Sequence, residues 1–449
     1  MAKRVNMRPS NFLAAVVGLA LTAAIGSAHG PGQTQNLPGS VIPAVSRSKD
    51  LGPAPGSQVF GIVVGLQPRY PDELRAFCDA VSDPRSPNYR QFISPSLVGE
   101  NFGASPADVD AVVRFLRSQG MRITLIAKNR MAVCATTTVS LAQAAFGTTI
   151  RRFAGTDSSG KAITFRANST PVKLPANIAR FATGVSGIQT YARPHARATF
   201  LNPTLTRGLY NTAPTYASGN KGQGRTIAFT NFAGLNLANV PLYITDWSLP
   251  VPAGGAGSNI SIVTWGSPGN TAPEDPEADL DLQMELGMAP LANIIVYDND
   301  AADYIGLTTK EANDNLADVI SESYGWSGFS LADLTALHNQ HLSMTAQGMT
   351  YCSASGDRAI DSAVVEGYWP NIDPEILMVG GTCANADGAT GARIGEDGWG
   401  QYDPLQPTNY GSGGGWVDFS LPPWNDPTFV VSFNTLPPWQ RGNGGSYLP

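Results

Sequence analysis

An acidic stretch in the second half of the chain carries side chains that could do acid–base chemistry. Residues 274–290 read EDPEADLDLQMELGMAP and place five carboxylates in the first eight positions. Glu277 and Asp281 are four residues apart, so on a helix both project from one face. The pair indicates either acidic residues that favour a helix N-terminus through the helix dipole or the acid and base groups of a catalytic site.

The residues around this pair predict the helix that presents it. Asp275 can cap the helix and Pro276 suits its first position. Leu280, Met284 and Met288 recur every fourth residue and predict the stripe that the helix buries. Like charges four apart destabilise an isolated helix by at most roughly 0.5 kcal/mol, so the rest of the fold must compensate.

Composition limits the class of protein. The chain has 449 residues, a net charge of −6, only 14% charged residues, 48 Gly and 34 Pro. This length suits a soluble protein of two or more domains with many turns. No basic stripe stands out, which argues against a nucleic-acid partner.

The N-terminus is typical of an exported protein. Lys3, Arg4 and Arg8 precede an apolar run at 12–25 and small residues up to Ala28. We interpret 1–28 as a signal peptide, because the run is shorter than a membrane span needs. Residues 29–57 are rich in Gly, Pro, Ser and Gln and are predicted to be a mobile leader.

The next segment, 58–186, is predicted to be a compact α+β domain. It opens with the strand QVFGIVVGL at 58–66, followed by a helix over about 72–81. Ser105 and Pro106 start a second helix, and MRITLIA, KNR and MAVCATT predict a hairpin before the short helix SLAQAAFG. Residues 187–206 are irregular and contain Arg193, Pro194, His195 and Arg197, which indicates a linker with a maturation site.

The remaining segment, 207–449, predicts an α/β domain. Six short apolar runs, GRTIAFTNF, NISIVTW, NIIVYD, DVISESYG, GMTYCSASG and EILMVGGT, alternate with stretches of helical spacing. This alternation predicts a parallel sheet with helices on both faces. Ligands bind such sheets at the carboxyl ends of the strands. The polar residues at those ends are Asp298, Asn299, Ser323 and Asp357.

Cysteine and histidine offer few other sites. Cys78, Cys134, Cys352 and Cys383 fall in two pairs, and export makes disulfides possible, although connectivity cannot be read from sequence. Cys78 lies on an apolar helix face, so a buried free thiol is the alternative. His338 and His341 share a helix face without any further metal-ligand motif, and we interpret them as a solvated face. The chain has no G-x-S-x-G motif, which argues against an α/β-hydrolase.

Several motifs together resemble those of the sedolisin (serine-carboxyl peptidase) family, whose precursors carry a kumamolisin-type activation domain. Glu277 and Asp281, then Ala289-Pro290 and a strand, follow the family's catalytic helix in order. VISESYGW is similar to its Ser-Trp-Gly strand end, with Tyr324 in place of Trp, and SASGD is similar to its Ser-Gly-Asp turn. In the first half, DPRSPNYRQFISP, FGASPADVDAVVRFLRSQG and LAQAAFGT resemble the activation domain.

The resemblance implies a subtilisin-like parallel sheet flanked by helices, incomplete at the C-terminus, after a smaller ferredoxin-like α+β activation domain. It implies that Glu277 is the general base toward a nucleophilic Ser, that Asp281 supports Glu277, and that Asp357 donates to the oxyanion. Ser323, Tyr324 and Gly325 would line the substrate cleft. A carboxylate base works in acid, unlike a histidine base.

The family's nucleophile motif, Gly-Thr-Ser-Ala, does not occur in the 449 residues. Nor does the calcium loop that follows it in the family, so we expect no cofactor in this chain and a calcium site only in sequence that is missing. GGTCA at 380–384 resembles the motif with Cys383 in place of Ser, but the family has an earlier Gly-Gly-Thr on a core strand at that place. We therefore interpret Cys383 as structural and predict that it pairs with Cys352.

These observations predict a secreted, monomeric precursor of an acid-acting serine-carboxyl endopeptidase, truncated and inactive as given. Its partners would be polypeptide substrates and its own activation domain, with no nucleic acid and no membrane. One alternative is a non-catalytic secreted protein that binds peptides or inhibits a peptidase. The other is a surface-binding module in which the carboxylates chelate a divalent cation.

Overall fold

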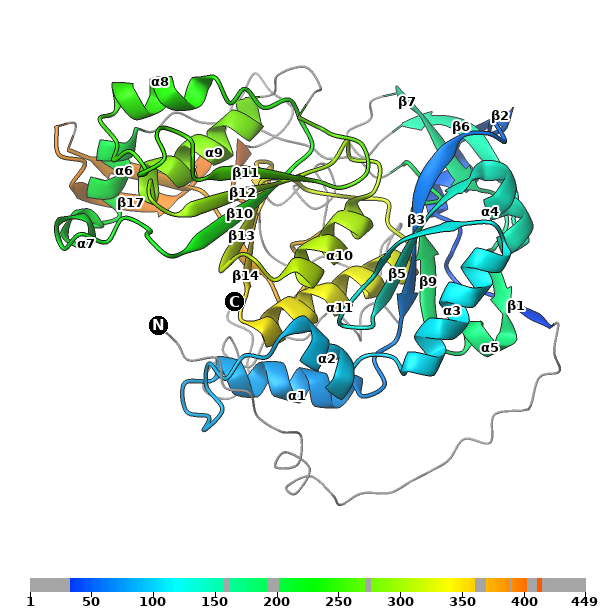
Figure 1. The fold of residues 1–449 in the computed structure, drawn as a ribbon. Helices are drawn as coiled ribbons and strands as arrows, with labels where there is room; N and C mark the ends of the chain where they lie inside the picture. Colours follow the sequence, from blue (N-terminus) through cyan, green and yellow to red (C-terminus); the bar gives the residue numbers. More distant parts are fainter. Residues whose placement is uncertain are drawn as a thin grey trace.

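The computed structural model describes residues 33–156, 162–191, 202–270, 276–359, 369–387, 389–401 and 410–413. Figure 1 shows two parts, an N-terminal part coloured blue to cyan and a part from residue 202 onward coloured green to orange. We call these the activation segment and the peptidase segment, after the functions that the resemblance implies for them. The predicted signal peptide, the linker residues 193–197 and the first two carboxylates of the acidic stretch lie outside the described residues.

The predicted mobile leader is wrong from residue 33 onward. β1 (Thr34–Asn36) pairs with β8 (Lys173–Pro175), and β2 (Lys49–Pro53) pairs with β6 (Ile150–Thr156), both antiparallel. The short helix η2 (Pro43–Arg47) lies between β1 and β2. Its Ala44 packs with Phe153 and Phe165. Composition misses these contacts because the partner strands of this segment lie about 100 residues or more further along the chain.

The activation segment is built on a four-stranded antiparallel sheet in the order β4-β5-β3-β9. Its strands are β3 (Val59–Leu66), β4 (Arg122–Ile126), β5 (Ala132–Thr138) and β9 (Ala182–Ser186). In chain order this is the β-α-β-β-α-β arrangement of ferredoxin-like folds, as predicted. A second sheet, β2-β6-β7 with β7 at Ala162–Asn168, is inserted before β9.

Helices cover one face of the four-stranded sheet. α3 (Pro106–Ser118) begins at Ser105, whose hydroxyl accepts a hydrogen bond from the Asp108 amide, and α4 (Val139–Phe146) follows β5 directly. α5 (Ala176–Ala179) completes this layer. The buried side chains between the helices and the sheet include Ile62, Val64, Leu66, Val112, Leu116 and Phe146. α1 (Pro71–Ser82) and α2 (Pro95–Asn101) lie at the lower edge of the segment (Figure 1).

The peptidase segment has a six-stranded sheet in the order β11-β12-β10-β13-β14-β15, and every neighbouring pair is parallel. The strands are β10 (Thr226–Asn231), β11 (Ile260–Thr264), β12 (Asn293–Asp298), β13 (Val319–Glu322), β14 (Thr350–Ala354) and β15 (Leu377–Val379). All six predicted apolar runs are strands of this sheet. The predicted α/β fold class is confirmed.

Helices pack on both faces of the parallel sheet. α8 (Asn239–Asp246) and α9 (Pro276–Met288) lie on one face, and α10 (Tyr304–Asp314) and α11 (Leu331–Gln347) lie on the other. α6 (Pro203–Leu209) and α7 (Ala213–Ala217) precede the sheet. The hairpins β16–β17 (Thr382–Ala386, Arg393–Gly398) and β18–β19 (Gly400–Gln401, Tyr410–Gly411) follow it.

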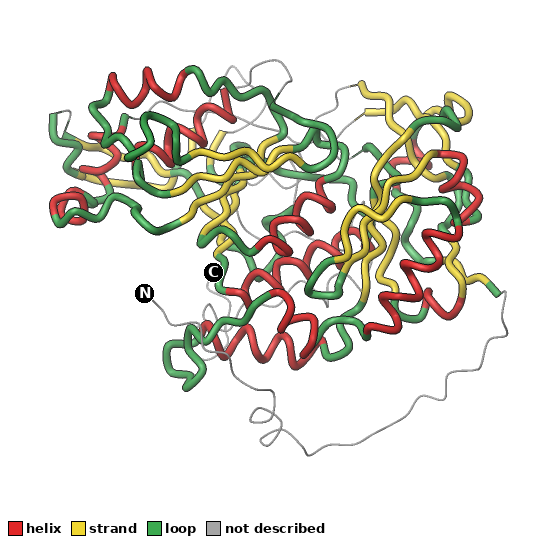
Figure 2. Tube along the Cα trace, viewed as in Figure 1, coloured by secondary structure: helices red, strands yellow, loops and turns green. Residues whose placement is uncertain are grey.

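α10 and α11 form the layer between the two segments. On one side they pack under the parallel sheet, and on the other α11 contacts β9, β3, α1 and α2 of the activation segment. Figure 2 shows these two red helices between the two groups of yellow strands. A cluster of Leu74, Phe77, Cys78, Val81, Val98, Met131, Leu342 and Ala346 closes the contact. In the described part of the chain, no helix is both long and apolar enough to cross a membrane.

Candidate active site

α9 holds the predicted catalytic carboxylates, and its packing decides where they point. Pro276 opens the helix as predicted, but the buried stripe is Ala278, Leu282 and Leu286 instead of the predicted Leu280, Met284 and Met288, which are half-buried. Leu282 and Leu286 pack against Phe229 of β10 and residues of β12. This rotation carries Glu277 and Asp281 inward, and Glu277 is only 3% exposed.

Asp281 is tied to the end of a sheet strand. The Ser323 hydroxyl, just after β13, donates a hydrogen bond to Asp281 Oδ1 across 2.7 Å. Burial raises the pKa of Asp281 to about 7, although the bond from Ser323 opposes the shift. In mildly acidic solution Asp281 therefore carries a proton, which Oδ2 can donate while Oδ1 accepts from Ser323.

A third carboxylate, Glu285, continues the row and was missed by the sequence reading. It lies one turn after Asp281, and both of its oxygens are buried with no hydrogen-bond partner among the described residues. Burial and then the charge of Asp281 raise its pKa well above the usual range. The four-residue spacing from Asp281 was the available signal, but the family frame directs attention to two carboxylates only.

Asp357 lies in the turn after β14, the strand next to the one that Ser323 follows. β13 and β14 are parallel neighbours with Glu322 opposite Ser353, so the turns that follow them leave the same edge of the sheet. Backbone bonds brace the Asp357 turn: the Gly411 amide donates to Asp357 O across 2.9 Å, and the Gly413 amide donates to Gly356 O across 3.1 Å. The structure thus brings Asp357 and Ser323 to one edge, where α9 also meets the sheet.

The three predicted cleft residues differ in their surroundings. Ser323 and Gly325 are half-buried, but Tyr324 is 3% exposed and its ring packs edge-on against Phe232 at 5.1 Å. In this structure Tyr324 is a core residue and does not form an open cleft wall. A large aromatic at a strand end is buried here because the loop after β10 folds back over it.

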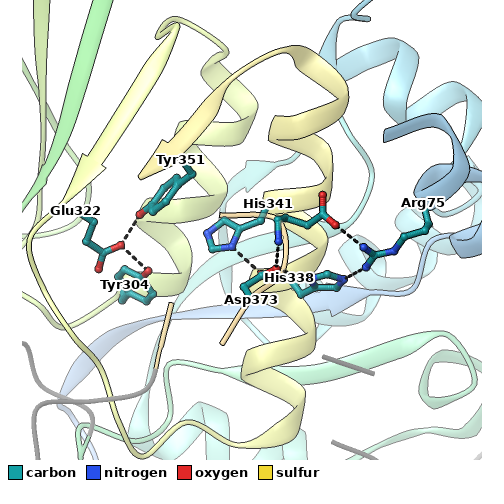
Figure 3. A network of polar contacts seen from close by, with 8 residues as sticks. Arg75, Tyr304, Glu322, His338, His341, Tyr351 and Asp373 are labelled. Atoms are coloured by element: carbon teal, nitrogen blue, oxygen red, sulfur yellow. Dashed lines mark hydrogen bonds and ion pairs between the residues drawn. The ribbon is translucent and has the colours of Figure 1, made fainter. Parts of the chain in front are cut away.

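Glu322, the last residue of β13, holds this strand end from beneath and was not singled out in the sequence. Its Oε1 accepts from Trp326 Nε1 across 2.7 Å, and its Oε2 accepts from the Tyr304 hydroxyl (2.9 Å) and the Tyr351 hydroxyl (2.5 Å). The two tyrosine bonds appear in Figure 3. Burial raises the pKa of Glu322 to about 7 against these three donors. Its position directly before Ser323 fixes the backbone that presents the Ser323 hydroxyl.

The other predicted strand-end residues support neighbouring loops. Asp298 is fully buried and accepts from Asn231 Nδ2 (2.7 Å) and the Asn270 amide (2.8 Å). Asn299 Nδ2 donates to the Trp265 carbonyl across 2.5 Å. Both therefore join strand ends to each other and take no part in the Asp281 row.

The predicted disulfides are absent, because all four cysteines are free thiols. Cys78 lies on α1, where its Sγ donates to the Leu342 carbonyl across 3.3 Å, whereas Cys134 lies on β5 and packs in a different cluster. Cys352 is a strand residue of β14 and Cys383 is exposed on β16. The buried-thiol alternative for Cys78 is the correct one.

The interpretation of His338 and His341 as a solvated helix face is wrong. Both lie on α11 and are 8% and 1% exposed. Their Nδ1 atoms lie 3.0 and 2.8 Å from the two carboxylate oxygens of Asp373. Helix periodicity cannot show that a second segment covers this face. Among the described residues, no group of three or more His, Cys, Asp and Glu side chains could hold a metal ion.

Comparison with known proteins agrees with this organisation. Residues 46–191 match the model of the pro-kumamolisin activation domain. The chain is 27% identical to Sedolisin from Pseudomonas sp. (strain 101) over 91% of its own length and 76% of that protein. It is also 27% identical to Xanthomonalisin from Xanthomonas sp. (strain T-22), over 86% of this chain and 52% of that protein. The chain is therefore similar to members of the sedolisin family along most of its length, and a part of its first half matches the activation domain.

A solved sedolisin structure is also similar to the chain. It is Pseudomonas sedolisin, a serine-carboxyl proteinase complexed with two molecules of pseudo-iodotyrostatin, with a TM-score of 0.40 and 23% identity over 54% of this chain and 68% of that one. The sedolisin relatives and the activation-domain match together give this chain the organisation of a serine-carboxyl peptidase precursor.

Proposed function

We propose that the chain is the precursor of an acid-acting serine-carboxyl endopeptidase that hydrolyses polypeptides. In this proposal Glu277 is the general base, Asp281 supports Glu277, and Asp357 is the oxyanion donor. Ser323, Tyr324 and Gly325 form the strand end along which the substrate backbone would lie. The boundaries 58–186, 187–206 and 207–449 for activation domain, linker and peptidase domain also stay predictions.

The bond from Ser323 to Asp281 is the observation that supports this proposal most. It anchors the α9 carboxylates at the carboxyl end of the parallel sheet, where α/β proteins bind their ligands. The raised pKa of Asp281 keeps this side chain protonated in mild acid, so that it can act as a hydrogen-bond donor on the same helix face as the proposed base, Glu277. Asp357 would likewise need a proton to donate to an oxyanion.

The nucleophile is the part of the proposal that this sequence does not supply. The 449 residues contain no Gly-Thr-Ser-Ala motif, so we propose that the chain as given does not hydrolyse peptides. Among the described residues no group of three or more His, Cys, Asp and Glu side chains could hold a metal ion, and we propose no residue of this chain as a ligand of the family's calcium site. No step of the proposed reaction depends on calcium.

The deciding experiment reads the transcript past the codon for Pro449 and assays each product on a denatured protein substrate between pH 3 and 7. If a Gly-Thr-Ser-Ala motif follows, the longer protein should hydrolyse the substrate in acid. Glu277→Gln and Asp281→Asn should each lower its activity by about 100-fold or more, whereas Glu396→Gln, on the exposed hairpin, should not. Activity that survives Glu277→Gln would disprove the assigned base.

The competing function is peptide binding or peptidase inhibition, which the absent motif favours. It requires the 449-residue product to accumulate as a stable protein in the culture medium. Export can be checked in the same experiment by N-terminal sequencing of the protein found outside the cells, with a start near residue 29 expected. Inhibition of a separate sedolisin by this product, without hydrolysis, would support the alternative.

A further inference from the structure

The helix that carries the candidate carboxylates, α9, ends without support from the chain that follows it. The last carbonyls of a helix need donors from outside the helix. In a longer helix the carbonyls of Gly287 and Met288 would accept from the amides four residues further on. Here the amides of Leu291 and Ala292 donate to other backbone carbonyls instead, each across 3.0 Å. Two carbonyls at the end of α9 are therefore open to other donors.

Two side chains from the start of the peptidase segment supply these donors. Arg207 Nη1, on α6, donates to the Gly287 carbonyl across 2.9 Å. The Tyr216 hydroxyl, on α7, shares its hydrogen between the Gly287 carbonyl, at 3.1 Å, and the Met288 carbonyl. The guanidinium thus places a positive charge at the C-terminal end of α9, where the helix dipole favours cations.

The two donors are themselves held in place. The Arg207 guanidinium lies over the Tyr216 ring, 4.8 Å from its centre, as in cation–π pairs. α6 lies beside α9 (Figure 1), so close that a Cβ on Gly287 would be 3.2 Å from Pro203 Cγ. On its other side, a Cβ on Gly208 would be 2.1 Å from a backbone oxygen of the turn between β16 and β17. Because α6 is packed on both sides, it presents Arg207 at a fixed position.

The apolar contacts of α9 determine its position along its own axis only weakly. Leu282 and Leu286 pack on the sheet, and such contacts have no preferred direction, whereas hydrogen bonds weaken over small displacements. α9 has hydrogen bonds at two places, from Ser323 to Asp281 and at Gly287. These places are roughly 9 Å apart along the axis, at about 1.5 Å per residue. A shift of the C-terminal end along the axis would therefore move Asp281 away from Ser323.

We propose that Arg207 is a positioning residue for the α9 carboxylates: together with Tyr216 it fixes the C-terminal end of the helix and so holds Asp281 within reach of the Ser323 hydroxyl. The importance of this placement for catalysis rests on the proposed function, in which Asp281 supports Glu277. The placement itself does not require hydrolysis, so it can be measured in the chain as given.

The protonation of Asp281 reports the bond from Ser323. Burial raises the pKa of Asp281 to about 7, and this bond opposes the shift. The titratable neighbours of Asp281 are Glu277 and Glu285, one turn before and one turn after it on α9, and the group facing it from the end of β13 is the Ser323 hydroxyl. Arg207 bonds the far end of the helix. Loss of Arg207 should therefore reach Asp281 through the bond from Ser323.

The test follows the titration of Asp281 in the full chain by NMR of carboxyl-labelled aspartate, with Asp281→Asn to assign the signal. Arg207→Met keeps most of the apolar stem of the arginine and removes its donors. If the helix end shifts, the ionised form of Asp281 loses its donor, and the titration midpoint should rise by about 0.5 or more. An unchanged midpoint in Arg207→Met would overturn the proposal.

A double-mutant cycle separates positioning from any direct effect of the Arg207 charge. Once Ser323→Ala has removed the bond to Asp281, the addition of Arg207→Met should change the midpoint by less than about 0.2, because both substitutions act on one interaction. Additive shifts would mean that Arg207 acts on Asp281 by another route, and the proposal would then be wrong.

The control for a general loss of stability is Ser105→Ala, which removes the hydroxyl that caps α3 in the activation segment. This variant should leave the Asp281 midpoint where it is in the parent chain. A rise equal to that in Arg207→Met would show that any destabilisation moves the midpoint, which contradicts a specific role for Arg207.

Tyr216→Phe covers the case in which Arg207→Met fails to fold. It removes only the hydroxyl and leaves the ring under the guanidinium, and it should raise the Asp281 midpoint in the same direction. In that case an unchanged midpoint in Tyr216→Phe would overturn the proposal. None of these measurements reads peptide hydrolysis, so their outcome does not depend on whether Glu277 is a catalytic base.

Discussion

At the scale of single residues, burial explains why so many acidic side chains can gather in a chain with few charges. Asp281 and Glu322 have pKa values raised to about 7, and Glu285 is shifted in the same direction. Burial of a carboxyl favours its neutral form. The crowded row on α9 is therefore a set of protonatable acids whose mutual repulsion largely disappears in mildly acidic solution.

The Ser323 hydroxyl is predicted to set the acidity of Asp281. Ser323→Ala removes the one bond that favours the ionised form, so the pKa of Asp281 should rise by about one further unit, equivalent to about 1.4 kcal/mol. Carboxyl-labelled aspartate followed by NMR, with Asp281→Asn to assign the signal, measures the shift. Ser321→Ala, on the same strand, is the control, and an equal shift there would refute a specific effect of Ser323.

Glu322 is predicted to stabilise the sheet through its three donors. Glu322→Gln leaves one acceptor oxygen and places an amide group opposite at least one of the three donors. The free energy of unfolding, measured by urea titration at pH 7.5, should therefore fall by about 2–4 kcal/mol. Glu396→Gln, on an exposed hairpin, should change it by less than about 0.5 kcal/mol. Equal stability of the two variants would mean that water replaces the Glu322 carboxylate as the acceptor for these donors without loss of stability.

At the scale of elements, α11 is the helix on which both segments depend. It begins at a capping box in which Ser330 and Asp333 bond each other's backbone amides and ends at Gly348 in the left-handed conformation. Its first turn passes so close to β9 that a Cβ on Gly184 would lie 2.1 Å from Ala332 Cβ. The contact between the sheet of the activation segment and α11 thus requires glycine at this position of β9.

Gly184→Val is predicted to separate β9 from α11. The added side chain cannot fit without moving the helix, so the amides of α11 and α1 should exchange at least about 10-fold faster while α3 is unchanged. Gly395→Ala is the matched control, because a Cβ there meets nothing within 4 Å. Unchanged exchange in Gly184→Val would show that the helix shifts to accommodate the valine at little cost.

At the scale of the whole molecule, buried carboxyls determine how stability depends on pH. Asp281 and Glu322 bind protons more tightly in the folded than in the unfolded chain, so the stability that they contribute is fully present below about pH 4 and is lost as pH rises through about 7. The free energy of unfolding of the peptidase segment should therefore be larger in mild acid than above neutral pH.

The pH dependence of the free energy of unfolding of the peptidase segment is predicted to show the contribution of these buried carboxyls. This free energy should increase as pH is lowered from 8 to 5, and Asp281→Asn should remove a share on the order of 3 kcal/mol, from about two pH units below the raised pKa of Asp281. Urea titrations followed by tryptophan fluorescence measure it, since Trp326 and Trp369 are fully buried. The same pH slope in Asp281→Asn as in the parent chain would exclude Asp281 as its source.

The local sequence pattern was sufficient to predict the order of helices and strands, because each element is determined mainly by residues that are neighbours in sequence. The six strands, the hairpin of β4 and β5, the cap at Ser105 and the first helical position of Pro276 were all predicted correctly. The predicted cap Asp275 lies outside the described residues. The predictions were wrong where a residue is buried by a segment that lies far away in sequence. The leader before residue 57, Tyr324 and the two histidines of α11 are covered by segments far away in sequence, and no periodicity shows that cover. Glu285 was missed because the family motif names only two carboxylates on this helix, and Glu322 was missed because a single carboxylate at the end of an apolar strand looks like a surface residue.

The side of α11 that meets the activation segment has an unusual composition for a buried surface. Of its residues there, Leu342 and Ala346 pack into the apolar cluster with α1, whereas Gln340 and Ser343 bond Asn129 and His338 meets Arg75. If the activation segment left, the surface uncovered on α11 would include hydrogen-bonding groups that water can satisfy beside the apolar Leu342 and Ala346. The contact thus shares the mixture of polar and apolar groups that is typical of surfaces between domains.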